Sequence, residues 1–151
     1  MENNFSFVPM TKADLPQLAQ YAAAAFSVKQ LQEKPWTKAK SLQHLQENFN
    51  PHYSWTIKLN HQIIGGAVGL PVTFQGGTEL FIDTLVISKP HRSQGVGTKF
   101  LDFLEQETQK KGLVGFILLS NTKLPSYNWY HHLGFKTTGW VELSKKFTSQ
   151  S

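Results

Sequence analysis

The stretch Arg92-Ser93-Gln94-Gly95-Val96-Gly97 is the most informative part of this sequence. It follows a strand-like run from Glu79 to Ile87, which Lys89-Pro90 should end, and it leads into an amphipathic segment that ends near Gly112. A strand, a glycine-bearing loop and a helix in this order present the unpaired N–H groups of a helix N-terminus, which carries about half a positive charge. Such a terminus binds phosphate, and Arg92 adds a charged donor.

The spacing of the two glycines leaves two interpretations open. The loop is either a phosphate cradle, or a tight strand-to-helix turn that Gly95 and Gly97 only shape. Two better-known phosphate motifs do not fit. The P-loop requires G-x-x-x-x-G-K-[ST], which no stretch matches, and the dinucleotide-binding fingerprint requires a third glycine where Phe100 stands.

The composition of the whole chain predicts a single cytoplasmic domain. Its 151 residues are 40% apolar, 13% aromatic and 17% charged, an ordinary globular mixture. The longest strongly apolar run, Phe116 to Leu119, is far shorter than the ~20 residues that cross a bilayer. Residues 1–4 have neither the basic start nor the apolar core of a signal peptide. We expect one domain over residues 1–151, with a frayed tail at 148–151.

Cysteine, histidine and lysine usage exclude several kinds of site. The chain has no cysteine, which excludes disulfides, Cys-ligated zinc and covalent cysteine catalysis. His131 and His132 diverge by about 100° on a helix, so they are poorly placed to chelate one metal, and no metal is expected. His44, with His52 and His61, is interpreted as a surface or core residue. The net charge is +5, but the lysines are scattered, so no nucleic-acid partner is expected.

Hydrophobic periodicity predicts a mixed α/β sheet with helices on both faces. Four helices are predicted, over 15–26, over 37–49, from the glycine loop to near Gly112, and from Pro125 to Gly134. Strands are predicted at Phe5–Val8, Trp55–Leu59, Ile63–Leu70, Glu79–Ile87, Leu113–Ser120, Phe135–Thr138 and Trp140–Phe147.

Two motifs in this order resemble those of a known family. The stretch from Arg92 to Gly97 resembles the R/Q-x-x-G-x-G/A pyrophosphate motif of the GNAT superfamily of acyl-CoA-dependent N-acyltransferases, and Trp129–Phe135 resembles that family's Tyr-x-x-x-Gly-Phe segment. The resemblance covers essentially the whole chain. It implies a mixed, mostly antiparallel central sheet of about six to seven strands, with about four helices on both faces. It also implies that acetyl-CoA is the co-substrate, and that an acetyl group passes to a primary amine by direct attack in a ternary complex.

The resemblance also assigns roles to residues of this sequence. The backbone amides of the glycine loop would hold the pyrophosphate, and the strand before the loop would pair with the pantetheine arm and polarise the thioester carbonyl. Tyr130 would donate to the leaving sulfur; its alternative is a core or rim aromatic. The family's usual asparagine, seven residues before that tyrosine, is Lys123 here, and Asn121 stands two residues earlier. The implied cofactor-binding residues are Leu85, Val86, Ile87, Arg92, Ser93, Gln94, Gly95, Val96, Gly97, Thr98 and Asn121.

The general base is predicted from the residues themselves. Asp83 stands in mid-strand among apolar neighbours, where aspartate is disfavoured and a lone buried charge is costly. We therefore expect Asp83 to act as the base or to bind the substrate ammonium, directly or through water; a structural hydrogen bond or an exposed strand face are the alternatives. Glu79 is the second carboxylate, equally compatible with a structural role. Without a bulge, Glu79, Asp83 and Ile87 share one face of the strand.

Two other functions remain open at this point. One is an acyl-CoA-binding regulatory module without turnover, against which the pairing of Tyr130 with Asp83 argues. The other is a small nucleic-acid-binding domain, which the scattered lysines disfavour. The amine acceptor is open among a polyamine, an aminoglycoside-like compound, an amino acid derivative and a protein amine. A homodimer is compatible with the sequence, although no feature decides it.

Overall fold

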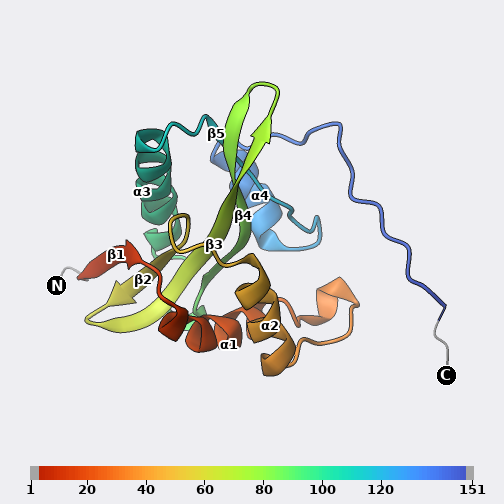
Figure 1. Cartoon of the computed structure of the whole chain (residues 1–151). Coiled ribbons are helices and arrows are strands. Elements are labelled where there is room, and N and C mark those ends of the chain that lie inside the picture. Colours follow the sequence, from red (N-terminus) through yellow and green to blue (C-terminus); the bar gives the residue numbers. More distant parts are fainter. Residues whose placement is uncertain (1–3, 149–151) are drawn as a thin grey trace.

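A five-stranded sheet forms the centre of the computed structural model, which describes residues 4–148 (Figure 1). The strands lie in sequence order, β1 (Phe5–Pro9), β2 (Trp55–Leu59), β3 (Gln62–Phe74), β4 (Gly77–Ile87) and β5 (Gly115–Ile117). The first three pairings are antiparallel and only β4 with β5 is parallel, so the sheet is mixed and mostly antiparallel, as predicted.

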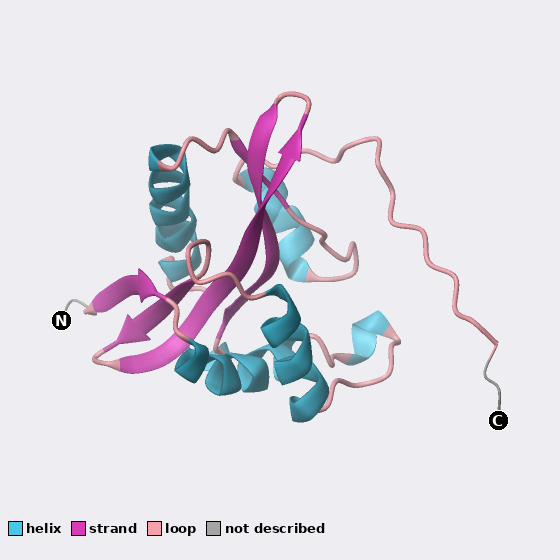
Figure 2. Cartoon of the chain, viewed as in Figure 1, coloured by secondary structure: helices cyan, strands magenta, loops and turns pink. Residues whose placement is uncertain are grey.

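Four α-helices cover this sheet on its two faces, as the sequence predicts (Figure 2). They are α1 (Leu15–Ala25), α2 (Lys38–Asn48), α3 (Val96–Lys110) and α4 (Pro125–His132). On one face, α1 and α2 bury Leu18, Ala19 and Leu45 against Val68 and Val86. The Ser41 hydroxyl of α2 donates to the Ala19 carbonyl at 2.8 Å, which ties the two helices together.

The other face of the sheet packs against α3 and α4. Phe100, Leu101 and Leu104 of α3 are buried against Leu80 and Ile82 of β4. Trp129 and Tyr130 of α4 lie at the edge of the same cluster. Burying one large apolar side chain stabilises the fold by about 2 kcal/mol. The three buried side chains of α3 therefore fix this helix, and with it the helix N-terminus, beside β4.

A β-bulge interrupts β4 at Asp83. In the register with β3, Thr84 lies opposite Val68 and Ile82 lies opposite Gly69, so Asp83 is the extra residue. The bulge changes which face the later side chains occupy: Ile82 packs toward α3, whereas Val86, an even number of residues later, packs toward α1 and α2. A strand without a bulge would have put both on one face.

The two strands predicted after α4 are not formed. The structure has five strands rather than six or seven, because residues 136–148 run as an extended segment without pairing to the sheet (Figure 2). The predicted strand over Phe135–Thr138 is replaced by contacts to α4 and β5: the Phe135 N–H donates to the Tyr130 carbonyl at 3.1 Å, and its ring stacks on Phe116 at 6.0 Å. Residues 149–151 of the predicted frayed tail lie outside the described residues.

Candidate active site

The N-terminus of α3 carries free backbone donors. Gly95 precedes the helix with a φ of 80°, and no side chain caps this end. The first amides of a helix have no acceptor within the helix itself, and here those are the amides of Val96, Gly97 and Thr98. Their N–H groups, together with the helix dipole, form a site for an anion.

The structure requires glycine at positions 95 and 97 for two different reasons. Gly95 needs its positive φ, and a Cβ there would meet no atom within 4 Å. Gly97 needs its missing side chain, because a Cβ would lie 3.1 Å from both Ile87 Cδ1 and Trp129 Cζ2. The predicted phosphate-binding role therefore depends on the free amides, since packing and conformation already account for both glycines.

Hydrogen bonds fix the loop between β4 and α3. Arg92 Nε donates to the Ile87 carbonyl at 2.8 Å, and Gln94 Nε2 donates to the Pro90 carbonyl at 3.1 Å. His91 Nδ1 lies 2.8 Å from the Ser88 hydroxyl. The side chains of Gln94 and His91 are thus used within the loop, whereas the exposed Arg92 keeps its terminal guanidinium nitrogens for a ligand.

The strands β4 and β5 are paired over only three residues. The pairing ends at Phe81 and Ile117, so among residues 4–148 no strand covers that edge of β4 beyond Phe81. The predicted pantetheine-binding residues Leu85–Ile87 lie on this stretch, while β3 pairs with their other edge. Beyond the end of β5, the Ser120 hydroxyl is buried without a hydrogen-bond partner within the described chain. The unpaired edge of β4 and the unpartnered hydroxyl of Ser120 can both form hydrogen bonds with the amide groups of a ligand.

Tyr130 lies on α4, half-buried against the same core cluster. Its ring is 5.0 Å from that of Trp129 and 5.2 Å from that of Phe135. Burial away from water raises the pKa of Tyr130 from 10.0 to about 12. The phenol is therefore protonated throughout the neutral and mildly alkaline range, and it is a hydrogen-bond donor there.

Asp83 is in hydrogen-bond contact with a histidine that its place in the sequence does not predict. Its Oδ2 lies 2.8 Å from His44 Nε2 and accepts a 2.8 Å hydrogen bond from the Thr84 hydroxyl. The bulge makes this possible, because it turns Asp83 and Thr84 together toward α2. The Asp83 side chain is 11% exposed and that of His44 is 40% exposed, so the imidazole is the half of the pair open to a ligand.

His44 is partly exposed, in agreement with the prediction of a surface or core residue, but it also has a carboxylate partner that the sequence does not predict. It contacts Asp83 across 39 residues of sequence, and its ring meets that of Trp36 edge-on at 5.6 Å. The imidazole is oriented from two sides, by a carboxylate and by an indole. No local pattern signals this contact, since it depends on how α2 lies over the sheet.

Two other predicted site residues lie apart from this group. Glu79 lies opposite Gly115, where β4 and β5 are paired, about 13 Å along β4 from Asp83. Asn121 Oδ1 accepts from the Lys123 backbone N–H at 2.9 Å, a turn that leads into α4. Glu79 is separated from the Asp83–His44 pair, and Asn121 has a structural role in the turn.

The described part of the chain contains neither a cluster of metal-binding side chains nor a helix that could span a membrane. Among residues 4–148, no three His, Asp or Glu side chains gather as a metal site would require. None of the helices in that range has the length and hydropathy needed to cross a membrane.

Comparison with known families identifies this arrangement. The sequence model of a family described as acetyltransferase (GNAT) matches residues 16–135. The chain belongs to the GNAT acetyltransferase family. In this GNAT chain the match includes the glycine loop, β4 and α4, and it ends before the extended segment 136–148. A search of curated proteins finds no match.

Solved structures share the GNAT fold at low sequence identity. An aminoglycoside N-acetyltransferase, AAC(6')-Iy in complex with CoA, is 15% identical with a TM-score of 0.72, over 97% of each chain. A predicted acetyltransferase with acetyl-CoA from Clostridium acetobutylicum is 19% identical with a TM-score of 0.68, over 95% of this chain and 96% of that one. An aminoglycoside acetyltransferase from an uncultured soil metagenomic sample, in complex with sisomicin, is 17% identical with a TM-score of 0.64, over 98% and 97%.

Proposed function

We propose that this protein transfers an acetyl group from acetyl-CoA to a primary amine by direct attack in a ternary complex. The observation that carries the proposal is the open edge of β4 beyond Phe81, which leads directly to the uncapped N-terminus of α3. One end of this path suits a pyrophosphate and the other reaches Asp83. The family match supports acetyl transfer as the class of reaction. The open edge of β4 and the N-terminus of α3 are where the cofactor would bind.

The direction of β4 orders the parts of the cofactor. The strand runs toward the loop before α3, so a cofactor with its pyrophosphate at the amides of residues 96–98 extends its arm back along β4, from Ile87 toward Asp83. Backbone N–H groups on this edge, and the orphaned Ser120 hydroxyl, are the polar partners for its amide groups. The thioester would then lie near the bulge, within reach of α2.

Proton removal from the amine is the task of the Asp83–His44 pair in this proposal. The carboxylate of Asp83 accepts from Nε2–H of His44, which leaves the lone pair on Nδ1. The Nδ1 atom takes the proton of the attacking amine, directly or through one water. Asp83 then stabilises the imidazolium that forms. The amine nitrogen bonds to the thioester carbon as the carbon–sulfur bond breaks.

Tyr130 stabilises the departing thiolate as a hydrogen-bond donor. Its pKa of about 12 lies roughly 3.5 units above that of an ordinary thiol, so the phenol does not give up its proton to sulfur completely. A hydrogen bond to a charged sulfur is still worth about 1.5–3 kcal/mol. The thiolate therefore leaves with the help of this bond, and solvent protonates it afterwards.

The test is thiol release from acetyl-CoA in the presence of a panel of amines. Aminoglycosides come first, since three of the structural neighbours are aminoglycoside acetyltransferases, followed by polyamines, amino acid derivatives and lysine peptides. We expect amine-dependent release. Tight CoA binding with no release for any amine would favour the regulatory module instead.

Variants of the pair test its role within this reaction. His44→Gln and Asp83→Asn should each lower kcat about 100-fold, and the double variant should be no worse than His44→Gln alone, because the two residues act as a unit. His52→Gln, an exposed histidine outside the site, is the matched control. A base role for the pair is refuted by full activity and an unchanged pH–rate profile in His44→Gln.

A further inference from the structure

The chain between α1 and α2 forms a loop over residues 27–36, which Figure 1 shows in orange. A hydrogen bond joins the two ends of this loop, because the Trp36 N–H donates to the Ser27 hydroxyl oxygen at 2.9 Å. Leu31, in the middle of the loop, is buried. Thr37 follows directly as the N-cap of α2, and its hydroxyl oxygen accepts from the Lys40 N–H at 3.1 Å. The backbone of Trp36 is therefore fixed on both sides.

The Trp36 side chain lies against the imidazole of His44. Their ring centroids are 5.6 Å apart and the ring planes are inclined by 65°, an edge-to-face arrangement that aromatic pairs favour. Trp36 is 38% exposed, so most of its surface is covered by the protein. Because Trp36 precedes the start of α2 and His44 is about two turns into that helix, the indole contacts the imidazole from the side of the loop.

Packing of the loop does not require an indole at this position. Leu31 already anchors the loop, and the bond to Ser27 uses only the backbone of Trp36. Trp36 lies outside the two clusters of buried residues that form the core. Among residues 4–148, the only aromatic ring that it contacts is that of His44. The contact with the imidazole is therefore the feature that sets Trp36 apart from a loop residue that only fills space.

The carboxylate of Asp83 fixes only one atom of the same imidazole. Its Oδ2 lies 2.8 Å from His44 Nε2, but the χ2 torsion of a histidine is broad, so the ring can still turn about its Cβ–Cγ bond. Such a turn displaces Nδ1 more than Nε2, because Nδ1 lies farther from that bond axis. A second contact, from a ring at the side of the imidazole, is what limits this turn.

Water also competes for this imidazole. The His44 side chain is 40% exposed, and bonds between exposed charged partners contribute little to stability, since both partners can be solvated instead. The indole of Trp36 keeps water from the part of the imidazole that it covers. A less polar surrounding strengthens the hydrogen bond to Asp83. Trp36 therefore supports the pair in two ways, by restricting the ring and by shielding it.

We propose that Trp36 is a positioning residue, which holds the His44 imidazole so that Nε2 stays at Asp83 while Nδ1 faces the amine. The inference rests on the proposed function, because it assigns Trp36 a part in the proton transfer to the Asp83–His44 pair. Trp36 acts through His44 and takes no proton itself. The carboxylate and the indole restrain the same ring from two directions.

Replacement of Trp36 by leucine and by phenylalanine tests the proposal through thiol release. A histidine on a helix has about two open χ1 wells and two χ2 orientations, so about one state in four is productive once the restraint is lost. We expect kcat to fall about fourfold in Trp36→Leu and by less than about twofold in Trp36→Phe, which keeps an aromatic ring. The Kd of acetyl-CoA, measured by calorimetry, should not change, since Trp36 contacts the base and not the cofactor path.

The matched control is Trp140→Leu, which removes an indole that is 92% exposed in the extended segment 136–148. This variant should keep the wild-type kcat. An equal loss in Trp36→Leu and Trp36→Phe, or a loss that appears in the Kd of acetyl-CoA and not in kcat, overturns the proposal. No thiol release from the wild type with any amine refutes the proposed function itself. An active wild type with an unchanged kcat in Trp36→Leu refutes only the role of Trp36.

A double-variant cycle separates positioning from a general loss of stability. If Trp36 and Asp83 restrain the same ring, Asp83→Asn lowers kcat about 100-fold and Trp36→Leu adds almost nothing to that loss. Independent effects would multiply to about 400-fold, and that result contradicts a shared role.

Nuclear magnetic resonance tests the contact without turnover. The imidazole C–H signals of His44, assigned by their loss in His44→Gln, should show nuclear Overhauser contacts to the Trp36 indole and a ring-current shift that Trp36→Leu removes. If the wild type shows neither, Trp36 does not position His44.

Discussion

Replacement of Tyr130 by phenylalanine tests the departure of the thiolate. The change removes one hydroxyl and keeps the ring that packs at 5.0 Å from Trp129 and 5.2 Å from Phe135. The free energy of unfolding should therefore fall by less than about 1 kcal/mol, as for an isosteric core substitution. The lost hydrogen bond to a charged sulfur, about 1.5–3 kcal/mol, corresponds to a decrease in kcat of about 10- to 100-fold.

The assay is continuous thiol release at saturating acetyl-CoA, with the best amine of the panel, between pH 6 and 10. Because burial raises the pKa of Tyr130 to about 12, its ionisation lies outside this range. Wild type and Tyr130→Phe should consequently give pH profiles of the same shape at different heights. A kcat within twofold of the wild type would remove Tyr130 from the reaction. A falling alkaline limb that only the variant abolishes would contradict the raised pKa.

The same pKa also predicts how alkaline pH changes stability. The folded pKa of Tyr130 lies above the unfolded value of 10.0, so between pH 10 and 12 the unfolded chain loses a proton that the folded chain keeps. Stability therefore falls as pH rises through this window, and it should fall less in Tyr130→Phe. Absorbance titration of the phenolate should show one tyrosine fewer titrating near pH 12 in the variant.

Four further substitutions test the packing of the glycine loop and of the sheet by urea unfolding. Gly95→Ala should lower the free energy of unfolding by about 1–2 kcal/mol, because alanine is strained at the positive φ of this position. Gly97→Ala gains helix propensity but places a Cβ 3.1 Å from Trp129 Cζ2, so it should lower the free energy of unfolding by about 0–2 kcal/mol and shift the fluorescence of Trp129. Gly65→Ala should cost about 3 kcal/mol or more, because its Cβ would overlap the Val86 carbonyl, and unchanged stability would contradict the β3–β4 register. Asp14→Ala should cost about 2 kcal/mol, since the buried carboxylate accepts from the Thr11 N–H and the Thr56 hydroxyl; a cost below 0.5 kcal/mol is incompatible with those bonds.

Local patterns in the sequence predict much of the fold. Helix periodicity places α1 to α4 to within a few residues, and the glycine loop marks the start of α3. The alternation of Trp140–Phe147 also predicts a strand, but the structure does not form it. A strand exists only with a hydrogen-bonded neighbour, and among residues 4–148 none pairs with this segment.

The active-site prediction is limited by contacts between distant residues. An aspartate in mid-strand is unusual by itself, so the sequence alone is enough to make Asp83 a candidate site residue. The bulge that turns it toward α2 has no signal in the sequence, and neither does its contact with His44, which lies 39 residues away. The two-residue repeat of a regular strand places Glu79 on the same face as Asp83. In the structure Glu79 lies where β4 pairs with β5, opposite Gly115 and away from the Asp83–His44 pair.

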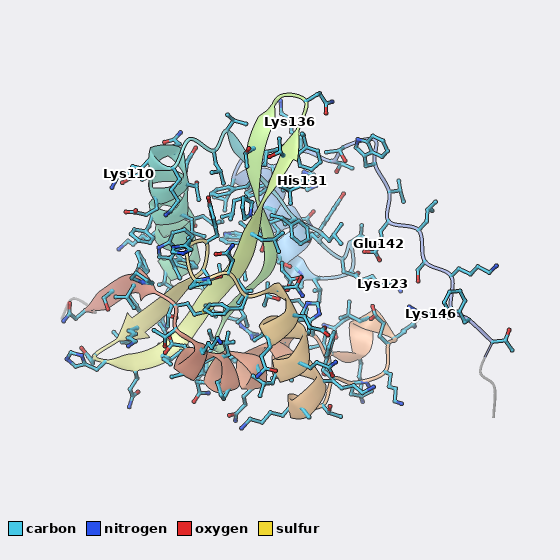
Figure 3. The ribbon with its side chains drawn as sticks, in the orientation of Figure 1. Lys110, Lys123, His131, Lys136, Glu142 and Lys146 are labelled. Carbon is cyan, nitrogen blue, oxygen red and sulfur yellow. The ribbon has the colours of Figure 1, made fainter. Side chains whose placement is uncertain are left out.

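The most direct test of the central claim is a thermal-unfolding titration with acetyl-CoA, coenzyme A and ATP. The wild type is compared with Arg92→Ala at the N-terminus of α3 and with Lys110→Ala at the other end of that helix, a charge-matched control (Figure 3). A hundredfold excess of ligand over Kd adds ~2.7 kcal/mol, or about 5–10 °C in Tm. We expect this rise with both CoA species and not with ATP, a smaller rise in Arg92→Ala, and a full rise in Lys110→Ala. If no CoA species changes the Tm of the wild type, the site at α3 does not bind the cofactor and the proposed function is wrong.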